Sequence, residues 1–247
     1  MNGRETEIGG DGRGFPSTSL TLVERFRTED PQARRRHLEA LVERYWKPVY
    51  WVLRSSWSKS NEDAKDLTQE FFLRVVLEGS VTQGFDPGKG SFRSFLKGAL
   101  SNFMLNATRD ASAQKRGGLA HIVRLDALEG HGPGLPAGDP SESPEQRFDR
   151  AWKEEILGRA LRHLEERLRA QGRESVFRIF CRYDLETTPG GTSYEDLAAE
   201  FGMSASMVKH ALSFAREEYR RAVTEQVGQD ASTPEELARE LRDLFSS

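Results

Sequence analysis

Three carboxylates share one face of the stretch NEDAKDLTQEFFLRVV, residues 61–76, if that stretch is helical. They recur at i, i+3 and i+7 and are Asp63, Asp66 and Glu70. Beside them runs an apolar stripe at i, i+4 and i+8, which consists of Leu67, Phe71 and Val75 and is typical of an amphipathic helix. Carboxylates in this arrangement suit acid–base catalysis, metal coordination or the docking of a basic partner. A merely solvated face is the fourth interpretation.

The catalytic and metal-binding interpretations find no support elsewhere in the sequence. Carboxylate-bridged metal sites in helical bundles use Glu-x-x-His ligand pairs, and none of the 5 histidines follows a glutamate by three positions. The glycines around Lys89 do not have the spacing of a phosphate-binding loop, because Ser91 does not directly follow the lysine. Cys181 lies beside Phe180 in an apolar stretch and is predicted to be a packing residue. We therefore expect no enzyme, no catalytic residues, no metal and no cofactor.

The composition is that of a polar globular protein. Of 247 residues, 30% are charged and 36% are hydrophobic, and the mean hydropathy is -0.65. The single cysteine excludes an internal disulfide bond and a cysteine-rich zinc site. No apolar run approaches the ~18 residues of a membrane-spanning helix, and the N-terminus lacks the apolar core of a signal peptide. These features predict a cytoplasmic protein without membrane insertion.

Charge is segregated along the chain, although the net charge is only -3. Residues 61–78 hold five acidic against two basic residues, a local charge of -3. Residues 89–116 hold six basic residues against one acidic residue, a local charge of +5. An acidic surface next to a basic one suits a molecule with two macromolecular partners. The alternative is that both charge runs are solvated faces, and composition leaves the two interpretations open.

Helical periodicity recurs along the N-terminal half, and no segment shows sustained period-two alternation, which predicts an all-α fold. Asp30 is predicted to cap a first long helix that Pro48 interrupts or restarts, with helix continuing over residues 49–57. Asn61 is predicted to cap the helix that carries the carboxylates, and Ser91 the helix that spans about 92–111.

We expect two helical domains joined by a flexible linker. The run GHGPGLPAGDPSESP, residues 130–144, is rich in Gly, Pro and Ser and marks a boundary. The expected division is a disordered N-terminus at 1–14, a first domain at 15–116, the linker at 117–144, a second domain at 145–227 and an acidic helical extension at 228–247.

The stretch SYEDLAAEFGMSASMVKHALSFAREEYR, residues 193–220, has the pattern of a helix-turn-helix. Ser193 caps a short helix, Gly202 supplies a turn with positive φ, and Ser204 caps a second helix. Such a pair places its second helix in a DNA major groove, although helix–Gly–helix also occurs in ordinary helical hairpins. Polar residues outside the apolar stripe of the second helix are the candidates for base and phosphate contacts: Ser206, Lys209, His210, Ser213 and Arg216.

Three motifs, in this order, resemble those of extracytoplasmic-function (ECF) sigma factors, the minimal promoter-specificity subunits of bacterial RNA polymerase. NEDAKDLTQEFFLRVV is similar to the family's core-binding helix, and GSFRSFLKGALSNFMLNATRDASAQKRGG is similar to the segment that melts and reads the −10 element. YEDLAAEFGMSASMVKHALSFAREEYR resembles the helix-turn-helix that reads the −35 element. The resemblance runs from about Phe15 to Val227 and looks closest to a subgroup with FPST, LTQEFF, FRSFL and QKRGG motifs.

The resemblance implies a transcription initiation factor whose partners are core RNA polymerase and promoter DNA. The surface that would dock on the clamp helices of the large polymerase subunit is here named the acidic face and consists of Asp63, Asp66, Gln69 and Glu70. The polymerase flap is a second implied contact, and an anti-sigma factor or other regulator is a further partner that the family allows. The implied phosphate contacts near the −10 element are Arg93, Lys97, Arg109, Lys115 and Arg116. Ser101 and Asn102 would capture a flipped base.

The sequence departs from the family pattern in two places. Met207, Ala211 and Phe214 stand where the second helix often has Thr or Arg, so the −35 contacts are expected to be fewer or of different specificity. The acidic extension exceeds a minimal sigma factor and is expected to cover a domain, oppose DNA binding or dock a regulator. The main alternative is a free-standing helix-turn-helix regulator, which has no need for the acidic face. The other is an interaction protein without DNA binding, which has no need for the cations near the −10 segment.

Overall fold

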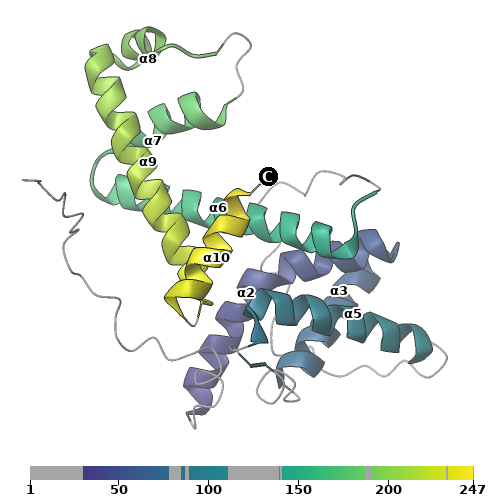
Figure 1. Cartoon of the computed structure of the whole chain (residues 1–247). Coiled ribbons are helices and arrows are strands. Elements are labelled where there is room, and N and C mark those ends of the chain that lie inside the picture. The colour runs from purple at the N-terminus through teal and green to yellow at the C-terminus, as the bar shows by residue number, and fades with distance from the viewer. Residues whose placement is uncertain are drawn as a thin grey trace, which may run out of the picture.

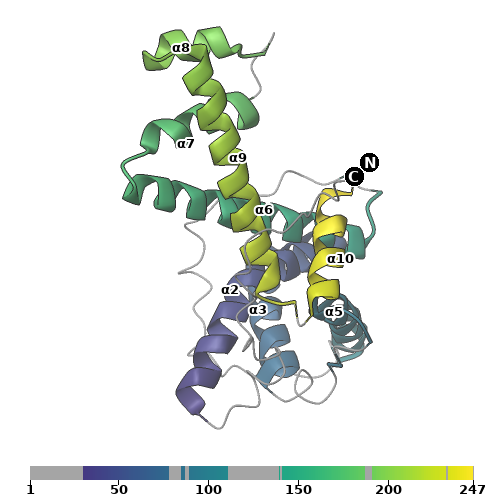
Figure 2. The same ribbon diagram turned by 60° about the vertical axis from the view of Figure 1, so that its left-hand side comes forward.

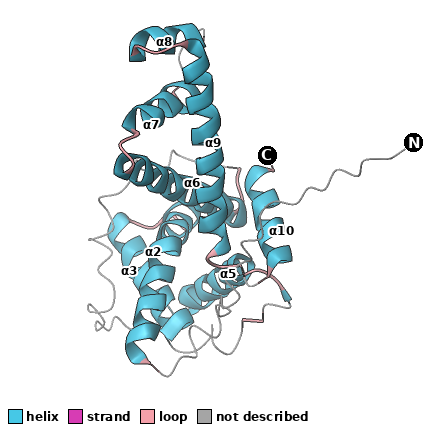
Figure 3. Cartoon of the chain, turned by 90° about the vertical axis from the view of Figure 1, so that its left-hand side faces the viewer, coloured by secondary structure: helices cyan, strands magenta, loops and turns pink. Residues whose placement is uncertain are grey.

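The structure is a computed structural model, which describes residues 30–77, 85–86, 89–110, 139, 141–186, 191–231 and 233–246. Within these residues all regular structure is helical, which confirms the all-α prediction (Figure 3). The helices are α2 (Pro31–Ser56), α3 (Asn61–Phe72), η1 (Leu73–Leu77), α5 (Phe92–Asp110), α6 (Pro144–Ala170), α7 (Glu174–Phe180), η4 (Cys181–Leu185), α8 (Tyr194–Phe201), α9 (Ala205–Gly228) and α10 (Pro234–Phe245). In the described part of the chain, none of them has the length and apolar character to cross a membrane.

Helix α2 begins where the sequence predicts but is not interrupted. The Asp30 carboxylate accepts a hydrogen bond from the Gln32 backbone N–H at 2.9 Å and caps the helix. Pro48 lies inside α2, so the predicted break or restart there is wrong, whereas the predicted continuation of helix beyond it is confirmed to Ser56. A proline removes one backbone donor, and the loss is tolerated here because the following turns are buried, with Val49 and Leu53 at 0% exposure.

Helix α3 is capped by Ser60 rather than by the predicted Asn61. The Ser60 hydroxyl accepts a hydrogen bond from the Asp63 backbone N–H at 3.1 Å. The side chain of Asn61 instead accepts a hydrogen bond from the Tyr50 hydroxyl of α2. After Phe72 the chain continues through the π-helix η1 to Leu77.

Helix α6 connects the two halves of the molecule (Figures 1 and 2). A reciprocal capping box between Ser143 and Gln146 starts it. Its first half packs on α2 and α5, where the ring of Tyr45 lies 5.6 Å from that of Phe92 and 6.4 Å from that of Phe148. Its second half packs Leu164 and Leu168 against α7 and α9. Both halves therefore share helix α6, which contributes its first half to one apolar cluster and its second half to another. The predicted linker lies outside the described residues except for residues 139 and 141–144.

The helix-turn-helix has the local structure that the sequence predicts. Ser193 and Asp196 form a capping box at the start of α8, and Gly202 ends that helix with φ 65° and ψ 37°. The Ser204 hydroxyl accepts a hydrogen bond from the Met207 backbone N–H at 3.2 Å and starts α9. The side chains that join α8 to α9 and α7 are fully or nearly fully buried: Ile179, Leu197, Val208 and Leu212.

The C-terminal helix α10 returns to the N-terminal half and lies beside the end of α9, close to the start of α5 (Figure 2). Thr233 caps it by accepting a hydrogen bond from the Glu236 backbone N–H at 3.1 Å, as predicted. Leu237 and Leu244 are 7% and 3% exposed and belong to the same apolar cluster as α2 and α5. The extension is therefore an integral part of the fold.

Candidate protein-binding and nucleic-acid-binding surfaces

The acidic face lies on the outer side of α3. Asp63, Asp66 and Gln69 are exposed, and Glu70 is half-buried. The opposite side of the helix is held in the core by Ala64, Thr68 and Phe71, each at 0% exposure. Residues four apart share a helix face, so burial of one side fixes the orientation of the other. The result is a rigid surface with its carboxylates toward solvent.

Two local contacts order the ends of the acidic face. The Ser60 hydroxyl donates to the Asp63 carboxylate at 2.8 Å. At the other end, Arg74 forms an ion pair with Glu70, with a nitrogen–oxygen distance of 2.5 Å. Both members of that pair are more than 40% exposed, so the pair is weak and open to exchange. The acidic face is thus accessible to a cationic partner.

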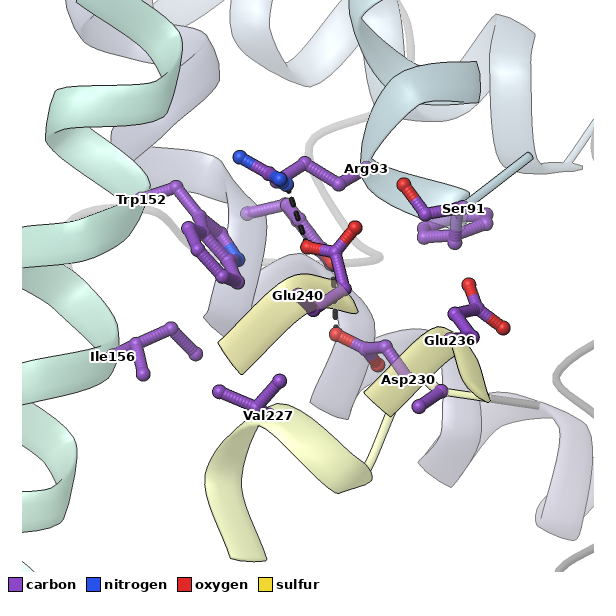
Figure 4. Close-up of a pocket in the computed structure, with 11 residues that line it drawn as sticks. Ser91, Arg93, Trp152, Ile156, Val227, Asp230, Glu236 and Glu240 are labelled. Atoms are coloured by element: carbon purple, nitrogen blue, oxygen red, sulfur yellow. Dashed lines mark hydrogen bonds and ion pairs between the residues drawn. The ribbon is translucent and has the colours of Figure 1, made fainter. Parts of the chain in front are cut away.

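Arg93, the first of the predicted phosphate contacts, is buried. It is 8% exposed and lies in the first turn of α5, beneath α6 and α10. Its guanidinium forms ion pairs with Asp149 at 2.7 Å, Glu240 at 2.7 Å and Asp243 at 2.9 Å. It also lies 4.4 Å from the ring centre of Trp152, which is a cation–π contact. Figure 4 shows Glu240 directed at the guanidinium with Trp152 beside it.

Lys97 lies one turn further along α5 and joins the same group of charges. Its ammonium donates hydrogen bonds to both carboxylate oxygens of Asp149, at 3.0 and 2.8 Å. We name the whole group the Arg93 cluster, and its members are Arg93, Lys97, Asp149, Glu240 and Asp243. Two of the cations that the sequence assigns to DNA are therefore paired within the protein: Arg93 with carboxylates of α6 and α10, and Lys97 with a carboxylate of α6.

The electrostatics of the Arg93 cluster favour the paired state. Burial lowers the pKa of Arg93, but the neighbouring carboxylates of Glu240 and Asp149 outweigh it, so the net pKa is raised above the ordinary value. A buried guanidinium is stable only when it is paired. Glu240 is itself 6% exposed, so each of the two buried charges depends on the other.

The remaining predicted −10 residues are placed as follows. Ser101 is half-buried and Asn102 is exposed on α5. Arg109 belongs to α5, but its side chain lies outside the described residues, as do Lys115 and Arg116 altogether. The structure thus brings Arg93 and Lys97 together and places Ser101 and Asn102 one to two turns further along the same helix.

The outer side of α9 is open, in contrast to the start of α5. Its exposed polar residues are here named the recognition face, and they are Ser206, Lys209, His210 and Ser213. Met207 is 57% exposed beside them. On the inner side, Val208, Leu212 and Ala215 are at most 1% exposed and fix the rotation of the helix.

Arg216 lies beyond the recognition face and is held within the protein. It forms hydrogen bonds with both carboxylate oxygens of Asp184, at 2.9 and 2.7 Å, and lies 5.4 Å from the ring centre of Tyr183. The hydrogen bonds to Asp184 raise the pKa of Arg216 above its ordinary value. In this conformation the guanidinium positions η4 against α9.

The acidic partners of Arg93 on two other helices are not predicted by the sequence patterns above. A signal for those on α10 was present in TPEELARELRDLF: an apolar stripe and an acidic stripe run side by side at i, i+4 and i+7. The apolar stripe is Leu237, Leu241 and Leu244, and the acidic stripe is Glu236, Glu240 and Asp243. Their target on α5 has no local signature, because tertiary packing creates it.

The fold defines a class of all-α proteins in which an acidic helix, a cationic helix and a helix-turn-helix follow one another along the chain. Residues 41–114, which contain the acidic face and most of the predicted −10 residues, match the family model of Sigma-70 region 2. The chain is also similar to the ECF RNA polymerase sigma factor SigE of Mycolicibacterium smegmatis. That relative is 29% identical over 205 residues, which cover 83% of this chain and 68% of the relative. No solved structure is significantly similar to the chain. The two matches support an RNA polymerase sigma factor of the ECF type.

Proposed function

We propose that this protein docks on core RNA polymerase through its acidic face and directs initiation by reading −35 duplex DNA and capturing opened −10 DNA. The observation that carries the proposal is the match of residues 41–114 to Sigma-70 region 2, because α3 and α5 both lie inside it. The proposal also covers the subgroup with FPST, LTQEFF, FRSFL and QKRGG motifs, to which the chain looks closest.

Docking through the acidic face rests on its exposure and rigidity. Fixed surface charges steer association and set the register of an interface, and flanking apolar residues provide binding energy. Leu67 is only partly buried at the edge of this face, so an apolar side chain is available beside the carboxylates. The expected surface on the partner is basic and helical, like the clamp helices of the large polymerase subunit.

Reading of the −35 element is assigned to the recognition face. The buried inner side of α9 and the capped α8 leave Lys209 and His210 directed outward. Side chains at the start of such a helix reach base edges in the major groove, and cations further along bind phosphates. Arg216 is proposed as a phosphate contact once it leaves Asp184, and the polymerase flap as a second partner of this half.

Capture of −10 DNA is assigned to α5. Ser101 and Asn102 provide small polar groups suited to a flipped base, and Arg93 with Lys97 provides cations at the start of the helix. Arg109, Lys115 and Arg116 are proposed as further phosphate contacts. A free-standing helix-turn-helix regulator is not favoured, because such a regulator needs no Sigma-70 region 2.

Run-off transcription with purified core polymerase and a genomic promoter library tests the proposal. Promoter-specific transcripts that require the protein are the expected result, and core binding without any transcript would contradict it.

A charge-reversal variant tests the docking role of the acidic face separately. D66K/E70K should reduce core binding in a pull-down by more than about a hundredfold, because each reversal replaces an attraction by a repulsion of several kcal/mol. The matched control is E166K/E174K, which reverses two exposed acidic residues on α6 and α7. Equal core binding by both variants would remove the acidic face from the proposal.

A further inference from the structure

The C-terminal helix α10 serves no step of the proposed function, yet it is held firmly against the N-terminal half. Leu237 and Leu244 are buried in the apolar cluster of α2 and α5. At the far end, the Lys153 ammonium donates to the Ser246 backbone carbonyl at 3.0 Å. A frayed tail would have neither contact, so α10 occupies a defined position.

The turn that leads into α10 is also anchored. Asp230 accepts a hydrogen bond from the Tyr45 hydroxyl at 2.8 Å and pairs with Arg44, which also contacts Gln229. Burial, and then Asp230, raise the pKa of the Tyr45 hydroxyl well above its ordinary value, so Tyr45 remains a donor. These contacts fix the end of α9 to α2, so the position at which α10 begins is also fixed.

The acidic stripe of α10 meets Arg93 at the start of α5. Glu240 and Asp243 both pair with Arg93, and Asp149 of α6 pairs with Arg93 and Lys97 (Figure 4). Carboxylate and phosphate oxygens accept the same charge-assisted hydrogen bonds from a guanidinium. One guanidinium at 8% exposure cannot bind three carboxylates and a DNA backbone at the same time.

The outer part of the cluster remains exchangeable. The side chains of Asp243 and Asp149 are 52% and 35% exposed, so salt and competing anions reach them. The inner pair of Arg93 and Glu240 is shielded at 9% and 8% exposure. A polyanion can therefore start to compete at the rim and complete the exchange only when α10 moves away.

We propose that α10 is an intramolecular competitor of DNA. Its carboxylates Glu240 and Asp243 pair with Arg93 in place of phosphates, while Asp149 of α6 pairs with Arg93 and Lys97. This inference rests on the proposed function, which assigns those two cations to −10 DNA. In the free protein, α9 remains able to bind DNA, whereas α10 blocks access of DNA to the start of α5. Binding of an opened DNA strand and undocking of α10 are two sides of one equilibrium.

The first test compares single-stranded DNA binding by full-length variants. E240Q/D243N removes the two competing charges of α10 with little change of shape, and E235Q removes an exposed charge from the first turn of the same helix. Fluorescence anisotropy is measured with a labelled mixed-sequence oligonucleotide of about 20 nucleotides, longer than the ~4–16 nucleotides of typical single-strand sites. Salt is varied from about 50 to 200 mM.

We expect E240Q/D243N to bind about tenfold more tightly than the wild type at the low-salt end. The slope of log affinity against log salt should steepen by about 0.7, because the variant releases one cation, Arg93, and each cation contributes about 0.7 on a single strand. E235Q should behave as the wild type, and R93Q/E240Q/D243N should lose the gain. Equal affinity and slope for E240Q/D243N and E235Q would overturn the inference.

A second measurement uses the unaltered protein, so it does not depend on any variant folding. Hydrogen exchange is followed with and without a saturating amount of the same oligonucleotide. Residues 234–245 should exchange faster with DNA present, whereas the buried middle of α6 should not change. Unchanged protection of α10 in saturating DNA would contradict the inference.

Core pull-down and run-off transcription separate this inference from the function on which it rests. If wild type and E240Q/D243N bind core and give equal transcript yields with equal oligonucleotide affinity, the competitor role fails and the sigma-factor role stands. If no protein binds core, the sigma-factor role fails. A tighter oligonucleotide complex that requires Arg93 would then still support the competition at α5.

Discussion

The recognition face of α9 and the Arg93 cluster of α5 differ in what covers them. Both contain cations assigned to DNA, and both lie on helices with a well-packed apolar side. On α9, Val208 and Leu212 fill the inner side and Lys209 remains exposed. On α5, two further helices pack over the first turn, and Arg93 is 8% exposed. Availability of a cation to DNA thus depends on its neighbours as well as on its place along the helix.

The largest expected difference between the two surfaces is in stability. R93Q leaves Glu240 buried without its partner, and breaking a buried ion pair from one side costs about 3–5 kcal/mol. The free energy of unfolding, measured by urea denaturation, should fall by that amount. Because K209A removes an exposed side chain, its effect should stay within about 0.5 kcal/mol.

The double variant R93Q/E240Q is the control for this prediction. It removes both buried charges and should recover most of the lost stability, since two neutral side chains need no mutual compensation. If R93Q were as stable as the wild type, the Arg93 cluster would not be closed in solution.

An intermediate effect is expected on duplex binding. K209A should weaken binding to the −35 duplex by about 1–3 kcal/mol, the range for a side chain that contacts a base edge. R220A is the matched control, because Arg220 is exposed on α9 three turns away and pairs with Glu217. Duplex affinity is measured by anisotropy on a promoter obtained from the run-off library. Equal losses for the two variants would mean that the recognition face is not where α9 meets DNA.

The smallest expected effect concerns Arg216. Its side chain is 36% exposed, between the exposed recognition face and the buried Arg93, and it pairs with Asp184. D184N removes its carboxylate partner and leaves the guanidinium free for a phosphate. The salt slope of duplex binding should steepen by about 0.9, the value for one further phosphate contact. E186Q is the control, because Glu186 pairs with Arg182 instead. An unchanged slope in D184N would show that Arg216 only positions η4.

Local predictions succeeded where all the interacting groups lie within a few residues. The caps at Asp30, Ser193, Ser204 and Thr233 were predicted correctly, because a capping side chain bonds a backbone N–H two or three positions ahead. The predicted cap at Asn61 was wrong, because the Asn61 side chain accepts a hydrogen bond from the Tyr50 hydroxyl of another helix. Pro48 stayed inside α2 for a related reason, since buried neighbours keep that helix continuous.

The positions of the candidate site residues were likewise predictable only where the pattern within a single helix determines them. Periodicity alone predicted the outward direction of Asp66 and Lys209, because a helix that buries one side must expose the other. No pattern within α5 could predict the partners of Arg93, because Asp243 lies 150 positions away in sequence. The amphipathic pattern of α10 indicates that it packs against something, but it does not identify the surface.

The sequence was sufficient for the all-α class, the order of the helices, most of their caps and the residues on the acidic and recognition faces. These features depend on spacing within single helices, where geometry is fixed by the backbone. The closure of α5 by α6 and α10, and the pairing of Arg216 with Asp184, arise from contacts between helices. Such contacts depend on how several apolar faces pack at once, and that information is present only in the folded chain.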